Sequence, residues 1–172
     1  AICSFLAKLG TSEAIEPYFD LETLAQSLDF NKLGRSQPKF DEEELKLFNH
    51  KFVRQLSYEK VADRVNVSKE FWEAVKGNLD TVVEAEKWHK VCYEEVAPEV
   101  EDLELTSMAA SLLPEGPWDN DTYQAWMNLV KANTDKKGKE LFHPIRKALT
   151  AQENGPELKV LLPFIGRERA IN

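Results

Sequence analysis

The sequence is poor in cysteine. Cys3 and Cys92 are the only two among 172 residues, they stand 89 positions apart, and neither belongs to a CxxC pair. A disulfide framework and a cysteine-ligated zinc site both need more cysteines at closer spacing, so the sequence argues against both. Such a chain is typical of a reducing compartment, and we expect it in the cytoplasm.

Glycine and histidine are also scarce. The seven glycines form neither GxGxxG nor GxxxxGK[ST], the loops that hold nucleotide phosphates, and no GxSxG element presents a nucleophilic serine. The three histidines, His50, His89 and His143, stand at no spacing to Cys or carboxylates that is typical of metal ligands. The sequence therefore predicts no metal ligands and no catalytic residues.

Long apolar runs are absent as well. No segment approaches the roughly 20 apolar residues that cross a bilayer, so no membrane partner is expected. The first residues, Ala1 to Leu6, have neither the charged flank nor the cleavage site of a signal peptide. Because the chain also begins without methionine, we expect it to be a fragment.

What the sequence does contain is helical periodicity. Apolar residues recur at i, i+3, i+4 and i+7, a spacing that places them on one buried helix face. These sets begin at Ile2, Leu21, Tyr58 and Tyr123. Strand-like alternation is scarce, so we predict an all-α protein of many short helices. Trp126 lies in the last set and is expected in the core, whereas Trp118 is expected to be the most exposed tryptophan.

Polar residues and breakers predict where the helices begin and end. The expected N-caps, whose side-chain oxygens accept from free amides of a first turn, are Asp20, Asp41, Ser57 and Asp121. Gly77-Asn78 should divide the segment from Lys69 to Cys92 into two helices. Proline is unfavourable inside a helix, so Pro144 and Pro163 are each placed at the first position of a new helix.

Charge is distributed unevenly. The whole chain carries a net charge of −8, yet residues 131–172 hold nine Lys or Arg against five Asp or Glu. The densest basic part runs from Lys136 to Thr150. A basic end on an acidic protein predicts an anionic partner.

Three stretches carry recognisable motifs. Residues 1–10 read AICSFLAKLG, residues 40–54 read FDEEELKLFNHKFVR, and residues 138–170 contain GKELFHPIRKALT, GPEL and GRERA. In the same order they resemble the A(L/I)xNyLaxLG, FD..KL..LN..(Y/F)IR and GK.LF.P(L/I)R.ALTG...GPEL...LG.ERA patterns of bacterial glutamyl-tRNA synthetases. The resemblance covers both ends and much of the middle of the chain.

The resemblance also implies what is missing. In that family the HIGH-like and KMSKS-like motifs, which bind ATP and activate glutamate, lie in a Rossmann-type domain N-terminal to the matched stretches, and neither motif occurs here. The resemblance implies that this chain is a C-terminal piece that binds tRNA without charging it. It also implies that ATP and Mg²⁺ are held by the absent catalytic domain and that this chain holds no cofactor. The implied domains are a stem-contact helical region, residues 1–66, and an anticodon-binding helical cage, residues 67–172, divided near 98–102.

The implied partner is tRNA, with no DNA and no membrane, and a monomer is expected. Arg146 is the first choice for reading sequence, because its planar fork can pair with or stack on a base and it occupies the P(L/I)R position. Expected phosphate contacts are Lys136, Lys137, Lys139 and Lys147, and expected base contacts are Thr150 and Gln152. Further candidates are Arg167 and Arg169 near the end of the chain, and Arg35 and Lys51 near the inner tRNA limb.

One motif departs from the family. Many members have a basic RxRxKTL-like element implicated in separating glutamate tRNA from glutamine tRNA. The nearest match here is VKGNLDTV, residues 75–82, which has Lys76 and places Asn78 where arginine is expected. This departure implies poor discrimination, or a preference for glutamine tRNA.

Two other functions remain open. The acidic residues 1–130 also fit a helical protein–protein interaction module with no nucleic-acid role, whose lysines are ordinary surface charges. A free-standing small enzyme would need an active site that the sequence does not contain. Measured binding to tRNA that weakens steeply as salt rises would distinguish a tRNA-binding fragment from both of these alternatives.

Overall fold

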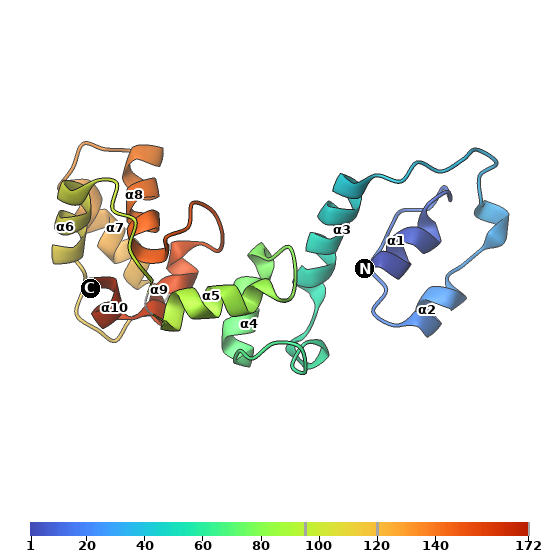
Figure 1. Cartoon of the computed structure of the whole chain (residues 1–172), viewed down its shortest axis with the longest axis horizontal. Helices are drawn as coiled ribbons and strands as arrows, with labels where there is room; N and C mark the ends of the chain where they lie inside the picture. The colour runs from blue at the N-terminus through green and yellow to red at the C-terminus, as the bar shows by residue number, and fades with distance from the viewer. Residues whose placement is uncertain (95, 120, 172) are drawn as a thin grey trace.

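The chain folds into short helices arranged along an elongated molecule. In the computed structural model, which describes residues 1–94, 96–119 and 121–171, α1–α3 lie at one end, α4 and α5 in the middle and α6–α10 at the other end (Figure 1). The α-helices are α1 (Ile2–Lys8), α2 (Leu21–Gln26), α3 (Glu42–Gln55), α4 (Lys69–Val75), α5 (Glu84–Tyr93), α6 (Leu103–Ser111), α7 (Thr122–Ala132), α8 (Lys139–Thr150), α9 (Leu158–Ile165) and α10 (Arg167–Ile171). Three 3₁₀ turns are η1 (Phe30–Lys32), η2 (Tyr58–Lys60) and η3 (Lys76–Asn78).

The predicted all-α class is confirmed. Within the described residues the β pairing consists of one isolated bridge, between Thr11 and Leu33. The division of the segment from Lys69 to Cys92 is also confirmed, because η3 ends α4 at Gly77-Asn78 and α5 begins six residues later. None of the helices in the described ranges is long and apolar enough to cross a membrane.

Two hydrophobic cores share helix α9. The first gathers buried side chains from the end of α3, from α4 and from α5, and the second gathers them from α6, α7 and α8. Leu161 and Ile165 of α9 belong to the first core, and Leu158 and Leu162 belong to the second. Since α9 is apolar on two faces, it joins the middle of the molecule to its C-terminal end. The predicted domain boundary at 66/67 stays a prediction, and the first core contains residues from both sides of it.

The tryptophans anchor these cores. Trp72 is fully buried, and its indole nitrogen donates to the Leu56 carbonyl at 3.2 Å. Trp126 is buried as predicted, and it donates to the Ala109 carbonyl at 2.8 Å. Trp118 is the least buried of the four, but it packs against the second core and donates to Pro114, so it is half-buried. Each of these donors therefore has the partner that a buried indole requires.

Helix starts are predicted with mixed success. Asp20 accepts from the Thr23 amide, and Asp41 accepts from the Glu43 and Glu44 amides, so these two N-caps are confirmed. Asp121 makes no capping bond, because Asp119 two residues earlier accepts from the amides of both Asp121 and Thr122. Ser57 precedes only the 3₁₀ turn η2 and also makes no capping bond. Ser57 and Asp121 therefore stand at N-cap positions as predicted, but neither makes the expected side-chain bond to a free amide.

The placement of the two prolines is wrong. Pro144 and Pro163 lie inside α8 and α9, each at the sixth residue of its helix. A proline in a helix interior removes one hydrogen bond and costs about 3 kcal/mol. Each helix nevertheless continues, because its flanking leucines and isoleucines are buried in the cores and each contributes about 1.5–3 kcal/mol.

Three of the four predicted apolar stripes are only partly buried, and in α2 only Leu24 is buried while Leu21 is 69% exposed. In α1, Phe5 is fully buried, whereas Ile2 and Leu6 are 61% and 50% exposed. The set that begins at Tyr58 forms no α-helix, although Val61 and Val65 enter the first core from the turn that follows η2. Periodicity therefore identified core residues here more reliably than it identified the helix.

A pair of ion bridges holds the N-terminal helices together. The buried Lys8 ammonium contacts a Glu13 carboxylate oxygen at 2.8 Å and the Ser27 carbonyl at 2.8 Å, and Lys32 contacts the other Glu13 oxygen at 2.6 Å. The hydrogen bonds from Lys32 and Lys8 lower the pKa of Glu13 from 4.5 to about 2. Glu13 thus links α1 to the turn η1 while it is ionised.

Acid should weaken this link. Because the pKa of Glu13 is depressed, its contribution to stability is complete above pH 4.5 and is lost as the pH falls toward about 2. We expect E13Q to melt below wild type at pH 7, and the difference in Tm to shrink over that pH range. Thermal melts followed by circular dichroism measure it, with E16Q at a neighbouring exposed carboxylate as control. A difference that stays constant from pH 7 to pH 2 would contradict the assignment.

Candidate nucleic-acid interface

Helix α8 places its apolar residues inward and its cations outward. Gly138, with a φ of 55°, leads into the helix, and Leu141 and Ile145 enter the second core. Lys137 and Lys139 are exposed at the start of the helix. They form no ion pair among the described residues, so both are available to an anionic ligand.

Arg146 is committed in part to the protein itself. One of its amino groups donates to the Pro156 carbonyl at 2.7 Å, which ties α8 to the loop of residues 151–157. The guanidinium is half-buried, and this burial lowers its pKa below the ordinary value for arginine. Its other amino group is shielded from solvent and has no hydrogen-bond partner among the described residues. The predicted reading residue therefore has a structural contact as well.

Thr150 faces the interior. It is 0% exposed, and its hydroxyl donates to the Arg146 carbonyl at 2.8 Å and accepts from the Gln152 amide at 3.2 Å. The structure thus gives Thr150 contacts in the turn that ends α8, and its predicted base contact stays a prediction. Gln152 follows it, half-buried, at the start of the 151–157 loop.

The same loop packs on α5. Gly155 has a φ of 140°, and a Cβ atom built on it would lie 1.9 Å from Cζ2 of the buried Trp88. Next to this contact lies a groove of about 470 Å³, which is lined by Lys87, Lys90 and Gln152 together with Glu86 and Glu94. Neither lysine of α5 was predicted from the sequence. Their signal was helical spacing, because Ala85, Trp88 and Val91 are buried and leave positions 87 and 90 outward.

Other predicted cations are paired with acidic residues. Lys147 contacts Glu99 at 2.7 Å and Glu101 at 2.8 Å, Lys136 contacts Asp102, and Arg167 contacts Glu115 at 3.3 Å. Arg169 is half-buried, and its Nε has no partner in the described part of the chain. These side chains are therefore less available than the exposed Lys137 and Lys139.

The candidates from the first half of the chain lie elsewhere. Arg35 and Lys51 are exposed, in the loop before α3 and on α3 itself, and Figure 1 shows α3 in a different part of the molecule from α8. Lys76 donates to the Leu56 carbonyl at 3.2 Å and contacts Glu73 at 2.6 Å. Asn78 is exposed at the end of η3. The structure thus separates two groups of candidates.

No metal centre is formed by the described residues, which contain no group of three or more His, Cys, Asp or Glu side chains placed to hold an ion. The thiol of Cys92 is buried, which raises its pKa to about 12. A thiol that ionises only at such pH is a poor nucleophile. The surface described above offers exposed cations and a groove, which can bind an anionic ligand.

Comparisons with known proteins extend over nearly the whole chain. The family model described as "Anticodon binding domain" matches residues 13–172. The chain is 43% identical over 179 residues to glutamate–tRNA ligase 2 of Hyphomonas neptunium, covering 99% of this chain and 40% of that protein. It is 46% identical over 176 residues to the glutamate–tRNA ligase of Azospirillum brasilense, covering 99% and 39%. The chain therefore spans about 40% of the length of these relatives.

Two solved structures have a similar fold. The glutamate-tRNA synthetase of Elizabethkingia anophelis superimposes with a TM-score of 0.65 at 19% identity, over 98% of this chain and 38% of that one. A glutamate tRNA ligase from Elizabethkingia meningosepticum, solved in complex with its amino acid, gives 0.67 at 18% identity, over 98% and 39%. The all-α architecture described above is thus shared with solved structures.

Proposed function

The chain belongs to the anticodon-binding domain family, and on that premise we propose that it is the tRNA-binding part of a glutamate–tRNA ligase. The observation that carries the proposal is the family match itself, which runs through α5, α8 and the 151–157 loop. The names of the relatives supply the identity of the ligase. The basic end of an otherwise acidic chain supports an anionic partner.

The proposed contacts follow from which cations are accessible. Phosphates of the anticodon arm contact Lys137 and Lys139 at the start of α8, and Lys87 and Lys90 on α5. An unstacked base enters the groove beside Gln152, whose side-chain amide can bond its edge. Arg146 holds the loop that carries Gln152 through its bond to the Pro156 carbonyl. Arg35 and Lys51 contact a second part of the tRNA.

The remaining roles concern the whole ligase. We propose that ATP and Mg²⁺ are bound by the part of the relatives that this chain does not cover, since its glycines form no phosphate-binding loop. Selection between glutamate and glutamine tRNA is assigned to Asn78, because Lys76 is engaged by Glu73 and Leu56. The proposed form is a cytoplasmic monomer.

Measuring tRNA affinity tests the proposal. We expect the chain to bind glutamate tRNA more tightly than an unrelated tRNA of similar length in fluorescence anisotropy titrations. K137A/K139A should weaken binding about tenfold at low salt and lower the slope of log K against log salt by about two, one for each lost phosphate contact. The control K60A/K69A removes the same charge from η2 and α4 and should have little effect.

Two results would contradict the proposal. If wild type binds no tRNA at low salt, the proposal is wrong and a protein-interaction module becomes the better explanation. If both double variants weaken binding equally, only the net charge matters and the α8 surface is not the site. Glutamine tRNA, titrated in parallel, tests the assignment of Asn78.

A further inference from the structure

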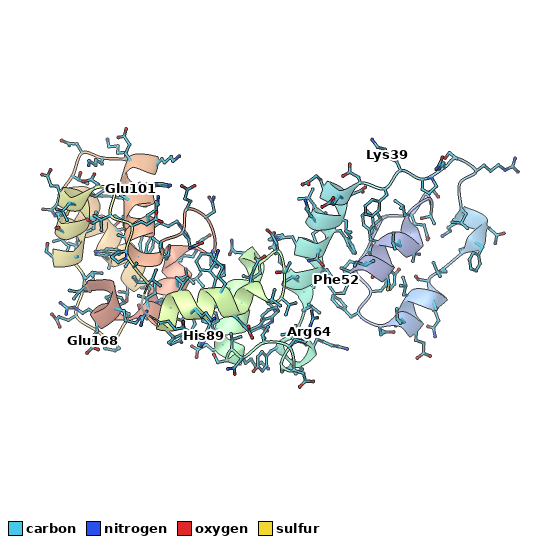
Figure 2. The ribbon with its side chains drawn as sticks, viewed as in Figure 1. Lys39, Phe52, Arg64, His89, Glu101 and Glu168 are labelled. Carbon is cyan, nitrogen blue, oxygen red and sulfur yellow. The ribbon has the colours of Figure 1, made fainter. Side chains whose placement is uncertain are left out.

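An acidic segment lies across the cations of α8. The acidic strap, residues 99–102, lies directly before α6 and carries Glu99, Glu101 and Asp102. Both oxygens of Glu101 are used, one on Lys147 at 2.8 Å and one on His143 Nδ1 at 3.0 Å. Glu99 adds a second carboxylate to Lys147 at 2.7 Å. Figure 2 labels Glu101 at the end of the molecule that contains α6 and α8.

The strap covers the cation that it contacts. The Lys147 side chain is only 13% exposed, although it projects from the outward side of α8. The two carboxylates raise the pKa of Lys147, and the same contacts lower the pKa of Glu101. At neutral pH the Lys147 ammonium and the Glu101 carboxylate are therefore both ionised. The carboxylates of the strap compensate the positive charge of Lys147 within the molecule.

Charge rather than packing holds the middle of the strap. Glu99 and Glu101 are exposed, and Val100 between them is 47% exposed, so little apolar surface is buried there. Asp102 differs, because it caps α6 by accepting from the Leu105 amide at 3.1 Å. The strap thus has a fixed end at Asp102 and a part at 99–101 that is attached by ion pairs whose carboxylates are open to solvent. Such pairs are individually weak, so a competing anion can displace them.

A phosphate can take the place of these carboxylates. Both groups are anionic oxygen acceptors for ammonium and imidazole donors, and RNA supplies them along its backbone. Lys147 lies on the same helix as Lys139, which is exposed and belongs to the proposed interface. A backbone that binds the start of α8 therefore brings further phosphates toward Lys147.

We propose that the acidic strap is an autoinhibitory phosphate mimic, in which Glu99 and Glu101 occupy Lys147 and His143 until tRNA phosphates displace them. This inference rests on the proposed function. It predicts that wild type binds tRNA more weakly than a chain with a neutral strap. Binding then requires phosphates that reach both cations, so short or poorly placed anions are rejected.

Neutralising the strap tests the inference. We expect E99Q/E101Q to bind glutamate tRNA about threefold to tenfold more tightly than wild type near 0.1 M salt, because displacement of the carboxylates is no longer needed. The salt slope should steepen by about one, since wild-type carboxylates recapture counterions when they are displaced. E99Q alone should give part of the gain, because Glu101 still holds the strap on His143 and Lys147.

The chain offers a matched control. Lys46 on α3 is also bridged by two carboxylates, Glu42 at 3.1 Å and Glu43 at 2.8 Å. E42Q/E43Q changes the net charge by the same amount without touching α8, and we expect its gain in affinity to be clearly smaller than that of E99Q/E101Q. Circular dichroism melts check that each variant is folded, and E99Q decides the question if the double variant is not.

Each outcome separates the two proposals. If wild type binds tRNA but E99Q/E101Q binds no more tightly, the strap is a structural link and the inference is overturned. The same holds if E42Q/E43Q gains as much affinity, because the effect is then one of net charge. If no variant binds tRNA, the proposed function fails, and the inference fails with it.

Discussion

Replacing Gly155 by alanine should lower the free energy of unfolding by about 2–4 kcal/mol, because the new side chain both strains the backbone and overpacks the core. Its φ of 140° is unfavourable for any residue with a side chain, and the new Cβ would lie 1.9 Å from Cζ2 and 2.3 Å from Cη2 of Trp88. Trp88 is only 4% exposed and lies in the first core, so it cannot move aside. The 151–157 loop must therefore leave α5.

Urea unfolding followed by circular dichroism measures this loss. Gly77 is the matched control, because a Cβ atom added there would have no neighbour within 4 Å and its φ is not positive. G77A should change stability by less than about 1 kcal/mol. We also expect G155A to weaken tRNA binding, since Gln152 belongs to the displaced loop. A G155A variant as stable as G77A would show that the loop does not depend on this contact.

Replacing Arg146 by alanine should affect stability and tRNA binding together. The change removes the donor to the Pro156 carbonyl and leaves a shielded acceptor unpaired, which costs about 1–3 kcal/mol. Release of the loop should lower tRNA affinity about tenfold or more, because the groove beside Gln152 loses one wall. R146K keeps the charge but loses the planar fork, so it should recover only part of each effect.

Two measurements on the same variants show whether Arg146 contacts a base directly or acts by holding the 151–157 loop in place. If Arg146 acts only by contacting a base, R146A should lose affinity while its urea midpoint stays unchanged. If it acts by holding the loop, the midpoint falls and the 151–157 segment becomes more sensitive to protease. K139A is the control on the same helix, and we expect its stability to stay within about 0.5 kcal/mol of wild type.

The fold class and much of the cores follow from local pattern. The stripe of Tyr123, Trp126, Met127 and Val130 predicted α7 and its buried face, because four apolar residues on one side of a helix have to be covered. Asp20 and Asp41 predicted real helix starts for the same local reason. Predictions failed where tertiary packing outweighed local preference, as at Pro144 and Pro163, which core leucines and isoleucines hold inside helices.

The basic end and the family motifs predicted where a nucleic acid would bind, but not which side chains remain available to it. Lys137 and Lys147 look equivalent in the sequence, yet the first is exposed and the second is bridged by Glu99 and Glu101. Thr150 and Gln152 look equivalent as well, yet only Gln152 lines the groove on α5.

The sequence by itself determined that the chain is helical, that its C-terminal end is basic and that its motifs are those of glutamyl-tRNA synthetases, because each property depends on neighbours within a few turns or on order along the chain. Only the tertiary structure decided which cations are neutralised and where the 151–157 loop lies. Those outcomes depend on partners more than 40 residues away, such as Glu101 for His143 and Lys147 and Trp88 for Gly155. Charge pairing and close packing act through space, so the same lysine is a ligand site or a structural ion pair according to what the fold brings beside it.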